Sequence, residues 1–79
     1  MMHENEMERL VRRAIDGYFT DLDGEKPSRV YNMVINCVEK PLLESVLRRV
    51  RGNQTHAAEM LGINRNTLRK KMKVHGIKF

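Results

Sequence analysis

The chain has 79 residues, a formal net charge of +5 at pH 7 and a single cysteine, Cys37. A chain of this length rarely buries enough apolar surface to be stable without a further brace. One cysteine excludes an internal disulfide, and no zinc-ligand spacing is present, so we expect no metal, no cofactor and association with a second copy. The sequence has no apolar run long enough to span a membrane and no secretion leader, which predicts a cytoplasmic protein without a membrane partner.

Charge is distributed unevenly along the chain. Residues 1–40 hold six Lys and Arg against eight Asp and Glu, whereas residues 41–79 hold nine against two. From Arg48 onward Glu59 is the only acidic residue. Such a basic half favours binding to a polyanion. The alternative is a solvated basic tail, which the helical pattern of this region argues against.

The first predicted helix runs from about residue 6 to Leu22. Apolar side chains recur at intervals of three and one from Met7, which places them on one face of a helix. Asn5 followed by Glu8 resembles a capping box, and Asp23-Gly24 is a turn signal. Met and aromatic residues at this spacing indicate core rather than a cofactor site.

The second predicted helix opens near Pro27-Ser28 and ends at Arg51-Gly52, where Gly allows a left-handed exit. Its apolar residues occur at almost every angle around the axis, so one face needs a partner subunit to cover it. Pro41 lies in the middle and costs about 3 kcal/mol by removing a hydrogen bond. The segment therefore either kinks or is two helices, and the unbroken apolar period favours the kink.

Two short helices follow, Gln54–Leu61 and Asn64–His75, in the arrangement of a helix-turn-helix. Ala58 lies where they cross, Gly62 supplies the positive φ of the turn, and Asn64 caps the second helix. The predicted core of this motif is Ala57, Leu61, Ile63, Leu68 and Met72.

A helical wheel separates two faces of the last helix. Leu68, Met72 and His75 point inward, whereas Asn66, Lys70 and Lys73 point outward with Arg69 on the flank. Arg65 lies in the first turn, the part of a recognition helix that enters the major groove, where Arg reads guanine. Asn64 is predicted equally as a cap and as a base contact. Lys71 lies nearer the buried edge and is a weaker phosphate candidate.

The N-terminal end of the first short helix, together with the residues just before it, is a second candidate contact surface. Arg51, Asn53 and Thr55 lie there, where side chains and backbone N–H groups can clamp phosphate.

The stretch RGNQTHAAEMLGINRNTLRKKMKVHGI, from Arg51 to Ile77, resembles the carboxy-terminal helix-turn-helix of the Fis family, the factor for inversion stimulation. The likeness continues upstream through KPLLESVLRRV and more loosely through AIDGYFTDLDG. It implies an all-α fold with four helices per chain and an intertwined homodimer. The whole chain is then one domain, with dimerisation helices over about 6–50, kinked at Pro41, and a helix-turn-helix over about 51–79.

The resemblance implies a sequence-tolerant, DNA-bending protein of the bacterial nucleoid that regulates transcription and assists site-specific recombination. Double-stranded DNA is the implied partner, and RNA polymerase or a recombinase is left open. The base-contacting positions are Asn64 and Arg65. The backbone-contacting positions are Arg51, Asn53, Thr55, Thr67, Arg69, Lys70 and Lys73, of which Thr67 comes from the resemblance alone. The expected dimer core is Leu10, Ala14, Tyr18, Val34, Val38, Pro41, Leu42 and Val46.

The chain departs from the family pattern at three places. Only about seven residues precede the first helix, which argues against the β-hairpin arm that activates invertases. Asn66 stands where a smaller residue is familiar, and Val74-His75 replaces a more basic, aromatic pair.

Other functions remain open at this level. One alternative is that the chain is the excised carboxy-terminal module of an enhancer-binding activator. The initiating methionines argue against this alternative and favour a free-standing protein. Another is a small basic factor that binds RNA or protein, although the basic helix has no aromatic platform. No catalytic residue is expected, because His3, His56 and His75 have no acid or nucleophile at useful spacing; His56 is read as a surface residue and His75 as a cap at the helix end.

Overall fold

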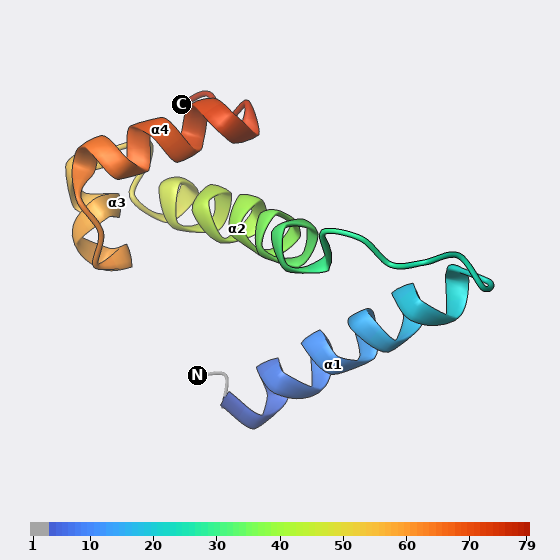
Figure 1. Ribbon diagram of the computed structural model, residues 1–79. Helices are drawn as coiled ribbons and strands as arrows, with labels where there is room; N and C mark the ends of the chain where they lie inside the picture. The colour runs from blue at the N-terminus through green and yellow to red at the C-terminus, as the bar shows by residue number, and fades with distance from the viewer. Residues whose placement is uncertain (1–3) are drawn as a thin grey trace. The chain divides into compact units, whose positions relative to one another are not determined.

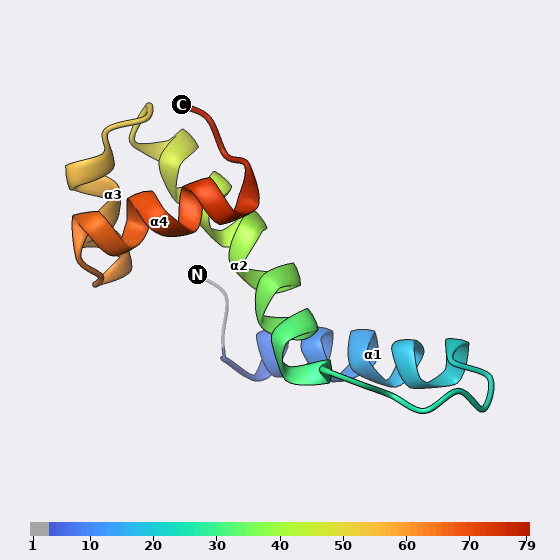
Figure 2. The ribbon, with the colours of Figure 1, turned by 45° about the horizontal axis from the view of Figure 1, so that its top comes forward.

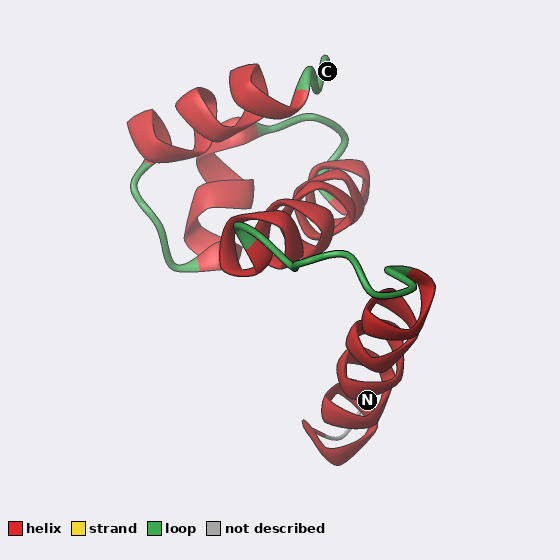
Figure 3. Ribbon diagram, turned by 45° about the vertical axis from the view of Figure 1, so that its right-hand side comes forward, coloured by secondary structure: helices red, strands yellow, loops and turns green. Residues whose placement is uncertain are grey.

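The computed structural model describes residues 4–79. They form four α-helices: α1 (Glu4–Asp21), α2 (Val30–Arg49), α3 (Gln54–Leu61) and α4 (Arg65–His75) (Figure 1). Helices and loops account for all of the described residues, without a strand (Figure 3). The predicted all-α class with four helices is therefore confirmed. None of the described helices combines the length and the apolar character that a membrane crossing requires.

The chain divides into two compact units. The first ends at Val34 and the second is Ile35–Phe79, so the boundary falls within α2. The second unit has a core of seven buried side chains: Leu43, Leu47, Ala57, Ala58, Leu68, Met72 and Ile77. Around it pack the partly buried Val46, Val50, Leu61 and Ile63. The predicted helix-turn-helix core is thus confirmed, and α2 contributes two leucines to it.

Between residues 5 and 34 no side chain is buried. Helix α1 has an apolar stripe, but Met7 and Leu10 are each 55% exposed and Phe19 is 45% exposed. The helix includes Glu4, so Asn5 lies within it and is not the predicted cap. Its carbonyl oxygen instead accepts a hydrogen bond from Arg9 Nε at 3.4 Å. The predicted turn is confirmed, with φ +49° at Asp23 and +89° at Gly24.

Helix α2 begins three residues later than the Pro27-Ser28 signal indicated. Arg29 has a φ of +54° and its carbonyl oxygen accepts the Met33 N–H at 3.1 Å, which starts the helical turn at Val30. The helix is continuous across Pro41. It is therefore one helix rather than two: the proline removes only one donor, and Leu43 and Leu47 anchor the following turns in the core.

Helices α3 and α4 end in the same way, with paired hydrogen bonds from the two residues that follow. After α3, the Gly62 N–H donates to Glu59 O and the Ile63 N–H to Ala58 O. After α4, the Ile77 N–H donates to Met72 O at 2.8 Å. Ile63 and Ile77 then pack against the core, which is the apolar contact usual in this type of ending. These endings reverse the chain in few residues and keep α3 against α4.

The exit from α2 differs from the prediction in one respect. Gly52 has the predicted left-handed backbone, with a φ of +81°, but Arg51 before it is also left-handed, with a φ of +54°. The Arg51 N–H donates to Arg48 O at 3.2 Å and the Gly52 N–H to Leu47 O at 2.8 Å. Arg51 therefore occupies the position that glycine usually takes.

Candidate nucleic-acid interface

The outer face of α4 is polar and cationic. Asn66, Arg69, Lys70 and Lys73 are exposed and together line one shallow hollow. On the opposite face Leu68 is fully buried and Met72 is 6% exposed. The predicted inward and outward faces of this helix are confirmed. Because the hollow presents amide and cationic donors, it suits an anionic ligand.

The N-terminus of α4 is capped by Asn64. Its Oδ1 accepts the Asn66 N–H at 2.7 Å and its φ and ψ are −71° and 144°, which confirms the predicted cap. Arg65 and Thr67 follow in the first turn, and both are exposed. A base contact by Asn64 or Arg65 stays a prediction. The capping bond occupies Asn64 Oδ1 and leaves the side-chain NH₂ group as the donor for a second role.

The loop between α2 and α3 carries the second candidate surface. Arg51, Asn53 and Thr55 are all exposed. Asn53 is the N-cap of α3, since its Oδ1 accepts the His56 N–H at 3.0 Å. Sequence reasoning gave Asn53 only a phosphate contact and did not identify this capping role. Thr55 lies in the first turn of α3, where free backbone N–H groups favour an anion.

The carboxy-terminal tail returns to this loop (Figure 2). Ile77 is buried, and Phe79 reaches Gly52 so closely that a Cβ on Gly52 would lie 3.4 Å from the Phe79 Cβ. Gly52 is restricted by its positive φ, whereas a Cβ there would make only an ordinary van der Waals contact with Phe79. The tail supports the segment that presents Arg51 and Asn53.

A cluster that sequence reasoning missed joins α2 to α4. Glu39 Oε2 accepts a hydrogen bond from Lys71 Nζ at 2.8 Å, and Glu39 Oε1 lies 2.8 Å from His75 Nε2. This contact explains why Lys71 lies nearer the buried edge of α4 than Lys70 and Lys73 do, which is the position predicted for it. It corrects the view of His75 as a cap without an acidic partner: Gly76 caps the helix, and His75 points inward to Glu39.

The cluster lowers the pKa of Glu39 below its ordinary value of 4.5. The main cause is the hydrogen bond from Lys71, followed by that from His75, and both favour the charged carboxylate. A lowered pKa in the folded state stabilises the fold above the unfolded pKa, and this contribution is lost as the pH falls through the folded value.

Among the described residues, His56 and Cys37 do not gather into a site. His56 is exposed on α3, Cys37 is a free and exposed thiol, and His3 lies outside the described residues. Within residues 4–79 no three His, Cys, Asp or Glu side chains are arranged to hold a metal ion.

Residues 36–75, half of the chain, match the family model described as "Bacterial regulatory protein, Fis family". The chain belongs to the Fis family. It is also 54% identical over 76 residues to a protein of Ralstonia nicotianae named "Putative Fis-like DNA-binding protein", an alignment that covers 96% of this chain and 99% of that relative. The resemblance found in the sequence is thereby confirmed, and the cationic face of α4 lies within the matched region of this Fis-family protein.

Glu39→Gln is expected to make the free energy of unfolding depend less on pH in the acid range. At pH 7 the variant should be less stable by about 0.5–1 kcal/mol, a small value because Lys71 is partly solvent-exposed. The wild type should lose this advantage as the pH falls below 4.5 and through the lowered pKa of Glu39, where the carboxylate is protonated. Urea unfolding at fixed chain concentration, repeated over a range of pH, measures the stability difference at pH 7 and its loss in acid. Glu44→Gln on the same helix is the control, and equal acid slopes for wild type and Glu39→Gln would contradict the assignment.

Arg51→Gly is expected to change folding and DNA affinity in opposite directions. A left-handed non-glycine residue costs about 1–2 kcal/mol, partly offset by the greater flexibility of glycine in the unfolded chain, so the variant should gain about 0.5–1 kcal/mol of stability. It should bind duplex DNA more weakly if the guanidinium contacts phosphate. Urea unfolding and a filter-binding titration on the same preparation make the comparison. Unchanged DNA affinity would remove Arg51 from the contact set.

Proposed function

We propose that this Fis-family protein is a DNA-binding homodimer that bends the duplex and regulates transcription. The observation that carries the proposal is the division of α4 into a buried apolar face and an exposed face with Asn66, Arg69, Lys70 and Lys73. A helix of this kind, held as the second helix of a helix-turn-helix, presents its first turn to the major groove.

The proposed contacts divide into two classes. Arg65 reads a guanine through its O6 and N7 atoms, and the Asn64 NH₂ group adds a second base contact. Arg51, Asn53, Thr55, Thr67, Arg69, Lys70 and Lys73 bind the phosphate backbone, which sets affinity and register rather than sequence preference.

The proposed dimer accounts for the apolar side chains that one chain leaves exposed. Of the expected dimer core, Leu10 is 55%, Leu42 48% and Val38 47% exposed. Ala14 and Pro41 are exposed as well, and the partly buried members are Tyr18, Val34 and Val46. A second copy that covers these side chains would supply the core that residues 5–34 lack.

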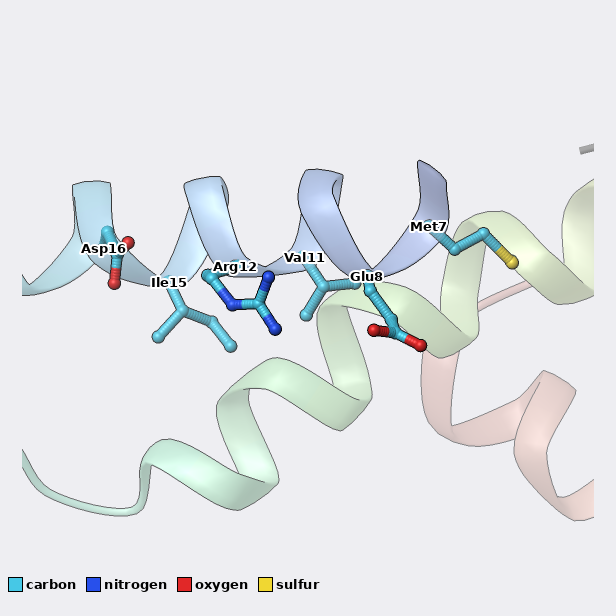
Figure 4. A pocket seen from close by; sticks show the side chains of 6 residues that line it. All are labelled: Met7, Glu8, Val11, Arg12, Ile15 and Asp16. Carbon is cyan, nitrogen blue, oxygen red and sulfur yellow. The ribbon is translucent and has the colours of Figure 1, made fainter. Parts of the chain in front are cut away.

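Helix α1 has a face suited to such packing (Figure 4). Met7, Val11 and Ile15 form an apolar row, and beside it runs a row of charges with alternating sign, Glu8, Arg12 and Asp16. An apolar seam flanked by both signs of charge favours pairing with another helix and fixes its register.

In the proposed mechanism two recognition helices contact one face of a bent duplex. One base-reading arginine per subunit specifies little sequence, so the cost of deforming the DNA between the helices, about 1–6 kcal/mol, selects A·T-rich centres. The protein then acts in the cytoplasm on nucleoid DNA, without enzymatic activity or a cofactor. RNA polymerase or a recombinase is the proposed protein partner, and recombination is the proposed second process.

Arg65→Ala and Lys70→Ala are expected to affect DNA binding differently, the first through sequence discrimination and the second through overall affinity. Arg65→Ala should reduce discrimination between a guanine-edged site and a scrambled duplex by about 1–3 kcal/mol per contact, because a base contact is lost. Lys70→Ala should weaken both duplexes by the same factor. Competition titrations measure the ratio, and identical behaviour of the two variants would contradict the assigned roles.

Mobility shifts on circularly permuted fragments test the proposal as a whole. A bending dimer should retard a fragment most when the binding site is central. Four phosphate-binding basic side chains per subunit (Arg51, Arg69, Lys70, Lys73) should give a slope near −7 when the logarithm of the binding constant is plotted against the logarithm of the salt concentration. Sedimentation at micromolar concentration should show the dimer. A folded monomer, or a salt slope shallower than about −3, would overturn the proposal.

A further inference from the structure

The carboxylate of Glu39 is shared by two side chains of α4 that lie one helical turn apart. Oε2 accepts from Lys71 Nζ and Oε1 pairs with His75 Nε2, each at 2.8 Å. The His75 side chain is 7% exposed and the Glu39 side chain 19% exposed, so the contact between them is partly shielded from water, whereas the Lys71 side chain is 38% exposed. This shielding strengthens the contact with His75 more than the contact with Lys71.

Glu39 lies on the same stripe of α2 as the core leucines. Glu39, Leu43 and Leu47 are spaced by four residues, which places them along one face of a helix. Leu43 and Leu47 share the core with Leu68 and Met72 of α4. These apolar contacts have no preferred direction, whereas the hydrogen bonds of Glu39 do.

The two hydrogen bonds of Glu39 reach α4 at different positions along its axis, and together they restrict the rotation of that helix about its own axis. Lys71 and His75 are about 6 Å apart along the axis at 1.5 Å per residue. A small rotation of α4 costs the non-directional apolar contacts of Leu68 and Met72 less than it costs a directed hydrogen bond. The same rotation would lengthen at least one of the two Glu39 contacts. Glu39 therefore limits the rotation of the helix that carries Arg65, Lys70 and Lys73.

We propose that Glu39 is a positioning residue for DNA recognition. By pairing with Lys71 and His75 it fixes the rotation of α4, so that Arg65 reaches a base edge while Lys70 and Lys73 reach phosphates. It also withdraws Lys71 from the phosphate-binding set. Glu39 itself contacts no DNA. The inference rests on the proposed function and deepens it, because it names a residue that controls discrimination.

The neighbouring lysines provide a matched test. Lys71→Gln and Lys70→Gln are compared on a guanine-edged duplex and a scrambled duplex over a range of KCl concentrations. Lys71→Gln should lose about five- to tenfold in discrimination, part of what an arginine–guanine contact provides, and should keep the wild-type salt slope. Lys70→Gln should keep the discrimination and lower the slope by about 2 per dimer, one phosphate contact from each subunit.

Glu39→Gln completes the comparison. It should lose discrimination at least as much as Lys71→Gln, because it weakens the His75 contact as well as the Lys71 contact. The double variant should be no worse than Glu39→Gln alone, because the Lys71 contact is already lost in that variant. Each preparation is normalised by titrating its active fraction with excess duplex, so that partial unfolding does not enter the ratio. If Lys71→Gln instead lowers the salt slope as Lys70→Gln does, Lys71 is an ordinary phosphate contact and the proposal fails.

Amide hydrogen exchange in the free protein separates this inference from the proposed function. Glu39→Gln should speed exchange at the Lys71–His75 end of α4 by about tenfold and leave α3 unchanged, whether or not the protein binds DNA. Glu44→Gln should change neither helix. Unchanged exchange in α4 would overturn the positioning role. Wild-type protein that fails to bind either duplex would overturn the proposed function and, with it, the link to DNA recognition, while the effect of Glu39 on α4 would still be measured by exchange.

Discussion

The second unit of the chain depends on a small apolar contact between α2 and the two short helices. Leu43 and Leu47 of α2 are 2% and 0% exposed, and they share one core with Ala57, Leu68 and Met72. Isolated helices of eight and eleven residues are marginal in water, so α3 and α4 depend on this packing for their stability. The outer face of α4 is free to be polar and cationic because its inner face supplies this contact.

A core of seven side chains leaves the orientation of α4 to be fixed by other means. The helix endings restrict it through the chain: Gly62 turns α3 into α4, and Ile63 and Ile77 return to the core after their helices. Glu39 restricts it through side chains, from the stripe of α2 that also carries the leucines. Local backbone geometry and one distant carboxylate thus act on the same helix.

Much of this arrangement follows from local patterns in the sequence. The bounds of α3 and α4, the Asn64 cap and the left-handed Gly62 were predictable because each depends on residues within one or two turns. The Glu39 cluster was not predictable, because 32 and 36 residues separate Glu39 from its partners and no periodicity marks such a pairing. The left-handed Arg51 was also missed, because the adjacent Gly52 is the stronger signal for that conformation.

The contact between Phe79 and Gly52 has a practical consequence for any modified form of the protein. The Cβ and ring of Phe79 lie over the loop that joins α2 to α3, and Ile77 is buried two residues earlier. A purification tag, fluorophore or fused domain attached behind Phe79 has to emerge beside that loop, where it would crowd Arg51 and Asn53. Labels placed at the amino-terminal end are remote in sequence from this loop and are the better choice for measuring the behaviour of the unmodified surface.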